Sequence, residues 1–315
     1  MLSKVKIFRN IFPYKFINKE TEKNFLIIKE KITSALKETE DFGKKINIET
    51  VSNQTEKLIE KQIIDKDDKI IKNAIIIKTG VKNLFLLSGV SEHILIVSIK
   101  NGLNIENAYK LASTFEKKLS KHLIFSWSKK FGFLGTDLLK IPHQIEIKLV
   151  FSIPAIYYSN LIEEFYETFK PNLNNISALN GGLLPLSYGF IETSFIPQKD
   201  ESIHRFIKRV NETAKAIEEM EKKNSEFYIS KKHENFIDMV FKSCGTLKYA
   251  KKLDYNEFLS LISKFLWGKN AGIIKSDYRM LIENFFELGD KNLAKTYQKA
   301  SEKRSEIIKR LIYFI

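Results

Sequence analysis

GFLGTDLLKIPHQIEIKLVFSIPAI, residues 132–156, is the segment from which the architecture of this chain is best inferred. Within it, residues 145–153 alternate in side-chain character with the period of two that a β-strand requires. Runs rich in β-branched and apolar residues predict further strands at residues 71–78, 84–88, 93–99 and 189–196. The first two thirds of the chain are therefore expected to carry a sheet.

Helical periodicity lies between these strands and after them. Residues 21–37 repeat apolar side chains at helical spacing, Thr21 can cap their start, and Asn104 is expected to cap a second helix. From Glu201 onward every apolar repeat is helical. Helical segments are expected at residues 233–243, 255–266, 278–288 and 291–312.

Strands followed by helices alone predict an α+β domain and then a small all-helical domain. The polar stretch from Glu221 to Lys232 marks the expected boundary between them. We therefore expect one domain over residues 1–225 and a second over residues 226–315.

Composition restricts the classes of protein to which the chain can belong. A length of 315 residues with 43% hydrophobic content suits a globular protein with a large core. The single cysteine, Cys244, excludes an internal disulfide framework, and the five histidines show no metal-ligand spacing, so no metal site is expected. No apolar run is long enough to span a bilayer, and the N-terminus lacks the apolar core of a signal peptide. We therefore expect a cytoplasmic protein with no membrane partner.

The formal net charge of +14 favours acidic partners in general. The lysines are scattered along the chain, however, and the abundance of Ile and Asn beside Lys is typical of AT-rich coding. We therefore expect no nucleic-acid partner. A basic binding module for an acidic protein or nucleic acid is kept as an alternative function.

Residues 132–156 resemble the active-site strand of the phosphagen (ATP:guanidino) kinase family, and most closely that of its bacterial protein arginine kinases. The family pattern there is roughly G-[YF]-L-T-x-C-P-T-N-L-G-T-G-x-R-A-S-V-x-x-x-L-P-A-L, and it aligns without a gap. The matching residues are Gly132, Leu134, Thr136, Pro154 and Ala155. The cysteine position holds Asp137 and the arginine position holds Glu146. The resemblance implies the family's catalytic domain, an antiparallel sheet flanked by helices, without its chemistry.

Two segments nearer the N-terminus resemble family motifs and are also substituted. LSKVKIFRN is similar to S-S-R-[IV]-R-L-A-R-N, so Lys4 and Lys6 hold two phosphate-binding arginine positions. GVSEHILI is similar to N-E-E-D-H-[IL]-R-I, with Val90 and Ser91 at the two glutamate positions and Leu95 at the arginine position.

A third segment, ISALNGGLLPLSYG, resembles V-R-G-x-Y-G-E-G-S-E-A-L-G. Here Ala178 replaces an arginine, Leu183 a glutamate and Leu186 the catalytic glutamate. The glycine pair Gly181–Gly182 is no nucleotide-binding fingerprint and predicts only a turn.

The resemblance implies which groups phosphoryl transfer would need. In the family, a cage of arginines holds the phosphates of ATP, which is bound with Mg²⁺, and two glutamates position and deprotonate the acceptor guanidinium. Lys4 and Lys6 keep positive charge but lose the fork of a guanidinium, and Glu146 reverses the charge. We therefore expect no retained catalytic residue, no ATP or Mg²⁺ cofactor, and at most weak nucleotide contacts from Lys4 and Lys6.

The last third of the chain resembles the helical extension that is typical of bacterial protein arginine kinases. Its matching segment is DMVFKSCGTLKYAKKLDYNEFLSLISKFLWGKNAGII, residues 238–274. The extension implies a homodimer or heterodimer formed through the helical domain. The family's phosphoarginine-sensing motif, R-D-x-x-R-A, would fall near Lys299 to Arg304, where KASEKR does not reproduce it.

These expectations favour a catalytically inactive pseudokinase that acts as a regulator or scaffold in stress-response protein quality control. Its partner would be a protein or an arginine-containing peptide. A residual or rewired ATP:guanidino phosphotransferase is the enzymatic alternative. Asp137 and Glu146 are either ordinary exposed carboxylates in a disused cleft or an anionic site for an arginine side chain.

Other notable side chains have simpler interpretations. His93 is expected to be a hydrogen-bonded structural residue, and Cys244 a small core residue. Trp127 and Trp267 are expected to anchor the core or an interface.

Overall fold

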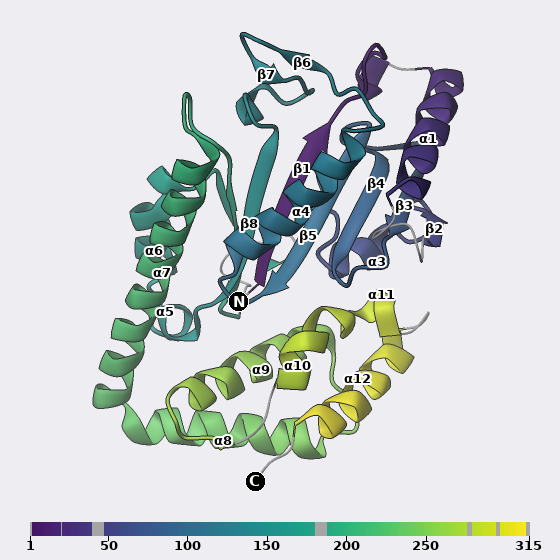
Figure 1. Ribbon diagram of the computed structural model, residues 1–315. Helices are drawn as coiled ribbons and strands as arrows, with labels where there is room; N and C mark the ends of the chain where they lie inside the picture. The colour runs from purple at the N-terminus through teal and green to yellow at the C-terminus, as the bar shows by residue number, and fades with distance from the viewer. Residues whose placement is uncertain are drawn as a thin grey trace. The chain divides into compact units, whose positions relative to one another are not determined.

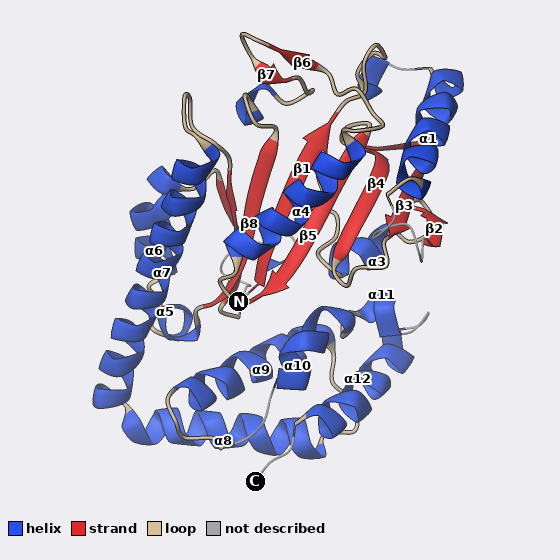
Figure 2. Cartoon of the chain, in the orientation of Figure 1, coloured by secondary structure: helices blue, strands red, loops and turns tan. Residues whose placement is uncertain are grey.

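The structure is a computed structural model that describes residues 2–19, 21–39, 47–179, 188–275, 279–293 and 297–312. It contains an eight-stranded sheet with flanking helices, followed by helices alone (Figures 1 and 2). The expected α+β class is confirmed.

The sheet has the strand order β2-β3-β4-β5-β1-β8-β10-β9. Its strands are β1 (Leu2–Arg9), β2 (Asn47–Thr50), β3 (Ile70–Lys78), β4 (Leu84–Val90), β5 (Ile94–Asn101), β8 (Ile145–Ser152), β9 (Asn175–Ala178) and β10 (Phe190–Phe195). The pairs β2–β3, β3–β4, β4–β5 and β5–β1 are antiparallel. The five predicted strands are all present, whereas β1, β2 and β9 were not predicted. The unpredicted β1 is central, because it lies between β5 and β8.

Two helices cover the part of the sheet that the N-terminal half builds. The helix α4 (Ile105–Leu119) runs across β1 and β5, and α1 (Glu22–Lys37) packs on β4 (Figure 1). Thr21 caps α1 as predicted, since its side chain accepts a 3.3 Å hydrogen bond from the Asn24 backbone N–H. Asn104 precedes α4 as predicted, but its side chain does not cap the helix. Instead the Oδ1 atom of Asn104 accepts a hydrogen bond from Nδ2 of Asn107 at 2.7 Å.

The remaining elements are a small hairpin and a series of helices. The hairpin consists of β6 (Trp127–Ser128) and β7 (Gly132–Phe133). The helices are α3 (Thr55–Glu60), α5 (Pro154–Tyr158), α6 (Ile162–Phe169), α7 (Ile203–Lys231), α8 (His233–Tyr249), α9 (Tyr255–Asn270), α10 (Arg279–Asn284), α11 (Asp290–Leu293) and α12 (Tyr297–Leu311). Short 3-10 turns include η2 (Leu138–Lys140). All described elements after β10 are helical, as predicted.

Spatial proximity divides the chain into two compact units built from six segments. Unit 1 comprises residues 1–55, 65–149 and 194–212, and unit 2 comprises residues 56–64, 150–193 and 213–315. The helix α7 runs without a break past residue 225 to Lys231. The division of the chain at 225/226 stays a prediction.

Unit 2 packs around Trp267, which is 2% exposed. Its indole ring stacks on Tyr158 and meets Phe236 at a centroid distance of 4.8 Å, and Nε1 donates to Oγ of Ser225 at 2.6 Å. Trp267 is therefore the predicted core anchor. The expectation fails for Trp127 as a core residue, because its side chain on the β6–β7 hairpin is 59% exposed. Cys244 is half-buried, and burial raises the pKa of its thiol.

None of the helices in the described part of the chain combines the length and the apolar character needed to cross a bilayer.

Candidate functional site

The alternation of β1 places its charged residues on two opposite faces of the sheet. Arg9 faces α4, where Nε donates to Oε1 of Glu116 at 2.6 Å. Side chains alternate along a strand, so Lys4, Lys6 and Phe8 lie on the other face. Their direct partners on β5 are Ile99, Val97 and Leu95. Leu95, at a predicted arginine position, is fully buried and pairs with Phe8.

Three lysines of unit 1 converge on one carboxylate. Lys4 and Lys6 come from β1 and Lys148 from β8, and these three residues are called the lysine cluster below. Nζ of Lys4 lies 2.8 Å from Oδ1 of Asp65, and Nζ of Lys148 lies 2.9 Å from Oδ2. Lys6 forms a third ion pair with Oδ2 of Asp65. The side chains of Lys4 and Lys6 are 0% and 1% exposed, so the ion pairs are shielded from solvent.

Asp65 begins a short segment, Asp65–Asp68, which is called the acid loop below. Asp68 closes it, because its Oδ2 accepts from the backbone N–H of Asp65 at 2.8 Å and lies 2.7 Å from Nζ of Lys6. The Oδ1 atom of Asp68 accepts from Oγ of Ser91 at 2.9 Å. Ser91, at a predicted glutamate position, therefore helps to hold the acid loop in place. Its backbone N–H also donates to the carbonyl of Lys69 at 2.7 Å.

Burial and charge act in opposite directions on the pKa values of this site. Burial alone would raise the pKa of Asp65, but the ammonium groups of Lys4, Lys6 and Lys148 outweigh it and hold that pKa well below the usual range. Burial would lower the pKa of Lys6, yet Asp68, Asp65 and Glu146 raise it. The carboxylate of Asp65 and the ammonium group of Lys6 are therefore both charged near neutral pH.

Glu146 is a buried carboxylate held by lysines, not an ordinary exposed group. It is 8% exposed, and its oxygens lie 3.2 Å from Nζ of Lys140 and 3.8 Å from Nζ of Lys148. Lys140 also lies 3.5 Å from Oδ2 of Asp137 and over the ring of Phe8 at 4.1 Å. The structure thus brings Asp137 and Glu146 to one ammonium group of the protein itself.

Asp137 has a local structural role as well. Its Oδ1 accepts from the backbone N–H of Leu139 at 3.0 Å and so caps the short turn η2. The side chain is 43% exposed, which agrees with the expectation of an exposed carboxylate at this position.

Sequence reasoning missed the buried carboxylate of Glu92. The side chain is 2% exposed and accepts from Nδ2 of Asn10 at 2.6 Å, and from the backbone N–H and Oγ1 of Thr136 at 2.5 and 2.7 Å. Burial raises the pKa of Glu92. Next to it, Nδ1 of His93 accepts from the backbone N–H of Ile11 at 3.0 Å, which confirms the structural role predicted for this histidine. In the sequence, Glu92 is simply an acidic residue that precedes a predicted strand. Nothing around it indicates that Asn10 and Thr136 bind its carboxylate.

Two further predicted positions are those of Ala178 and Leu186. Ala178 is buried on β9, which belongs to unit 2. Leu186 lies outside the described residues, as do Leu183 and the pair Gly181–Gly182.

Arg304, in the segment expected to correspond to the sensing motif, is fully buried in unit 2. Its guanidinium donates to the carbonyls of Leu253 and Leu288 at 2.7 and 2.8 Å and pairs with Asp290. These bonds join α12 to the start of α11, so the arginine contributes to packing within the unit.

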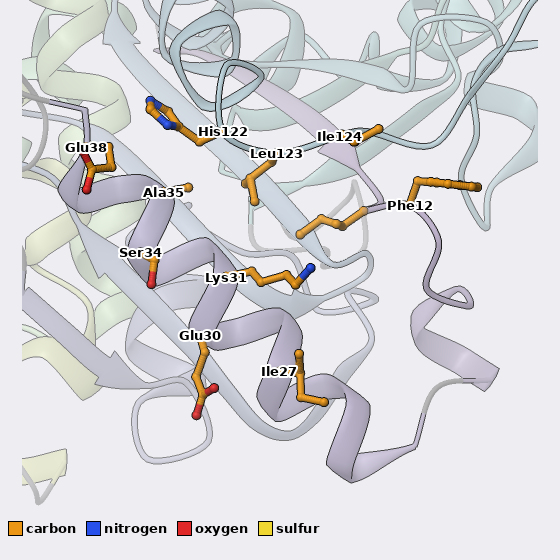
Figure 3. A pocket seen from close by; sticks show the side chains of 11 residues that line it. Phe12, Ile27, Glu30, Lys31, Ser34, Ala35, Glu38, His122, Leu123 and Ile124 are labelled. Atoms are coloured by element: carbon orange, nitrogen blue, oxygen red, sulfur yellow. The ribbon is translucent and has the colours of Figure 1, made fainter.

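The described residues also form an open groove in unit 1, with a cavity of about 640 Å³ (Figure 3). One wall is α1 with Ile27, and the other contains Phe12 and Ile124; Glu38 and His122 lie at one end. None of the predicted site residues that the structure describes lines this groove. No group of three or more potential metal ligands was found within the described ranges.

Comparison with known proteins agrees with the expected family. The sequence model of the ATP:guanido phosphotransferase C-terminal catalytic domain matches residues 27–181. A protein-arginine kinase of Clostridium acetobutylicum is 24% identical over 266 residues, covering 83% of this chain and 78% of that protein. One of Clostridium novyi is 21% identical over 294 residues, covering 90% and 83%.

Solved structures share the fold. The duplicated taurocyamine kinase of Schistosoma mansoni matches with a TM-score of 0.63 at 16% identity, over 72% of this chain and 33% of that longer chain. A lombricine kinase matches with a TM-score of 0.59 at 12% identity, over 70% of this chain and 65% of its own. Sequence segments, fold and relatives agree: residues 27–181 match the catalytic domain of the ATP:guanido phosphotransferase family.

Proposed function

We propose that this protein is a catalytically inactive member of its family, a pseudokinase that acts as a regulator or scaffold in protein quality control. The observation that carries the proposal is the acid loop. Asp65 receives ion pairs from Lys4, Lys6 and Lys148, so the positive charge left on this face is neutralised within the chain.

The residues present do not fit the phosphates of a nucleotide. A phosphate group needs exposed donors, whereas Lys4 and Lys6 are buried and already paired. Leu95 offers no donor, and Glu146 adds negative charge on the same sheet face. Removing one preorganised donor typically costs about 3 to 4 kcal/mol of transition-state stabilisation. Loss of several such donors supports the absence of phosphoryl transfer.

The test is calorimetry with ATP and Mg²⁺ on the purified protein, combined with an assay of phosphoryl transfer to an arginine-rich protein. We expect neither binding nor transfer. Transfer above background would overturn the proposal and establish the residual phosphotransferase, which is the activity that the names of the curated relatives suggest.

A scaffold needs a partner surface, and we propose that unit 2 supplies one for a second copy of the chain or a related chain. One stripe of α8 carries Ile237, Phe241, Gly245 and Tyr249 at intervals of four residues, and Phe241 and Tyr249 are 56% and 73% exposed. A side chain added at Gly245 would meet nothing within 4 Å. Because Gly245 has no side chain, another helix can approach this exposed apolar stripe closely at its centre.

A further inference from the structure

The groove between α1 and the wall that contains Phe12 and Ile124 is called the α1 groove below, and all of its lining residues belong to unit 1 (Figure 3). Several large apolar side chains of this groove are open to solvent. Phe12 and Ile124 are 60% and 72% exposed, and Ile27 on the facing wall is 37% exposed. Exposed apolar side chains that gather in a concave site are typical of a binding surface.

The backbone holds both walls of the α1 groove in place. The N–H of Phe12 donates to the carbonyl of Ile124 at 2.9 Å, and the N–H of Ser126 donates to the carbonyl of Asn10 at 2.8 Å, so the two segments of one wall are paired. The other wall, α1, has its opposite face buried in the core. A groove with fixed walls binds a ligand without the entropic cost of ordering the site.

The lining of the α1 groove is acidic, although the chain is basic. The chain has 52 lysines and arginines against 38 aspartates and glutamates, whereas the groove is lined by two glutamates, Glu30 and Glu38, and one lysine, Lys31. All three side chains are exposed. Glu38 and His122 lie at the end of the groove away from Ile27 (Figure 3). Charge complementarity therefore favours a partner with a positive group at the Glu38 end.

The dimensions of the groove suit a short piece of extended chain. Its lining on α1 runs from Ile27 to Glu38, a rise of about 16 Å along the helix. An extended segment advances by about 3.3 Å per residue, so about five residues span this length. Between the two ends, the side chains of Lys31 and Ser34 can donate hydrogen bonds to the main-chain carbonyls of such a segment.

We propose that the α1 groove binds a short extended segment of a partner protein, with an apolar side chain at one end and a lysine or arginine side chain at the other. The apolar side chain packs against Phe12, Ile27 and Ile124, and the basic side chain pairs with Glu38. The inference deepens the proposed scaffold role, on which it rests, by stating where a protein partner binds and what its segment contains. No residue of the lysine cluster lines this groove.

The experiment selects ligands from a phage-displayed library of random hexapeptides on the full-length wild type and on Ile124→Ser. The selected peptides are synthesised, and their affinities are measured by fluorescence polarisation. Ile48→Ser is the matched control, because it makes the same change at a 44% exposed isoleucine of unit 1 that does not line the groove. Thermal unfolding verifies that each variant is folded.

We expect the peptides selected by the wild type to contain an apolar and a basic residue. They should bind Ile124→Ser at least about tenfold more weakly, because a buried apolar side chain loses its contact, and bind Ile48→Ser like the wild type. Glu38→Gln should weaken binding several-fold, whereas Glu106→Gln, the same change at an exposed glutamate of α4, should not. Replacing the basic residue of the peptide by norleucine should lower affinity for the wild type but not for Glu38→Gln.

Equal selection by the wild type and Ile124→Ser, or selection of acidic peptides, would overturn the proposal. Other occupants give other results. A wild-type dimer that Ile124→Ser abolishes would assign the groove to a second copy of the chain, and sedimentation with phosphatidylserine vesicles that Ile124→Ser abolishes would assign it to a lipid surface; either result contradicts the proposal.

Ile27→Ser, on the facing wall, replaces Ile124→Ser if that variant does not fold, and the same loss of affinity is expected. Phosphoryl transfer by the wild type would refute the proposed inactivity and leave peptide binding in the α1 groove unchanged. The two failures are therefore distinguishable.

Discussion

At the scale of single residues, the lysine cluster is stabilised by ion pairs with carboxylates of the same chain. Lys4 and Lys6, at predicted arginine positions, both form ion pairs with the carboxylate of Asp65. Glu146, at another predicted arginine position, forms ion pairs with Lys140 and Lys148. The net effect is a site whose stability depends on ion pairs inside the protein rather than on a ligand.

Acid should destabilise the protein through Asp65. The pKa of Asp65 is lower in the folded than in the unfolded chain, so its contribution is present above the unfolded pKa and is lost as pH falls through the folded one. Asp65→Asn should lower the free energy of unfolding near neutral pH by about 3 to 5 kcal/mol, because it breaks a buried ion pair. The variant should also lose less stability than the wild type as the pH falls below about 4. Urea unfolding at a series of pH values measures both effects. Asp67→Asn is the control and should behave like the wild type.

Glu221 should have the opposite pH dependence. Burial raises its pKa to about 8, although the backbone N–H groups of Ala155 and Ile156 donate to its oxygens at 2.7 and 3.0 Å. Since the pKa of Glu221 is higher in the folded than in the unfolded chain, its contribution to stability is fully present at low pH. This contribution is lost as the pH rises from about 4.5 to about 8. Glu221→Gln should therefore gain stability relative to the wild type at pH 9, on the order of a few kcal/mol, as measured by urea unfolding.

Glu219 provides the control for Glu221, because it lies on the same helix and is fully exposed. Glu219→Gln should show no such gain at pH 9. An equal response of the two variants would mean that burial of Glu221 does not set its protonation.

At the scale of elements, the helix α8 has one face in the core and one face exposed to solvent. Phe236, Val240 and Leu247 are buried, whereas Phe241 and Tyr249 point away from the core. A glycine in a helix interior costs about 1 kcal/mol relative to alanine. No neighbour within 4 Å restricts position 245, so unit 2 itself gives no reason for this cost.

The proposed dimer can be tested on this helix. We expect the wild type to have the mass of a dimer by light scattering, and Phe241→Glu to be monomeric, because a charge would be buried in the α8 interface. Lys242→Glu, a charge change at the neighbouring exposed residue, should leave the dimer intact. A monomeric wild type would refute this assembly.

At the scale of the whole molecule, the two compact units are interleaved along the chain. Unit 2 includes residues 56–64 and 150–193 besides its C-terminal helices. Glu60 in the first of these segments accepts from the backbone N–H groups of Lys291 and Asn292, both at 3.1 Å. The packing of the last third of the chain therefore depends on residues that come much earlier in the sequence.

A fragment of residues 226–315 should consequently fail to fold on its own. It lacks Ser225 and Tyr158, which contact Trp267, and it lacks the Glu60 carboxylate at the start of α11. Circular dichroism should show reduced helicity with no cooperative thermal transition. A cooperative transition in the fragment would support the division at 225/226 as an independent folding boundary.

The sequence by itself determined the class of fold, because apolar periods of two and of 3.6 residues are local properties. It also pointed to the family whose catalytic domain matches residues 27–181. The assignment of Lys4, Lys6, Leu95 and Glu146 to arginine positions of that family stays a prediction. β1 was missed because LSKVKIFR mixes charged and apolar residues, and only its insertion between β5 and β8 buries both of its faces.

Only the tertiary structure decided which carboxylate pairs with the lysine cluster. Asp65 lies 61 residues from Lys4 and belongs to a polar segment, IDKDDK, that reads as an ordinary exposed loop. Likewise Glu92 and Glu221 look like surface acids until their distant partners are known. The physical reason is that periodicity reports the neighbours of a residue along the chain. The charge balance of a buried site depends on neighbours that only folding brings together.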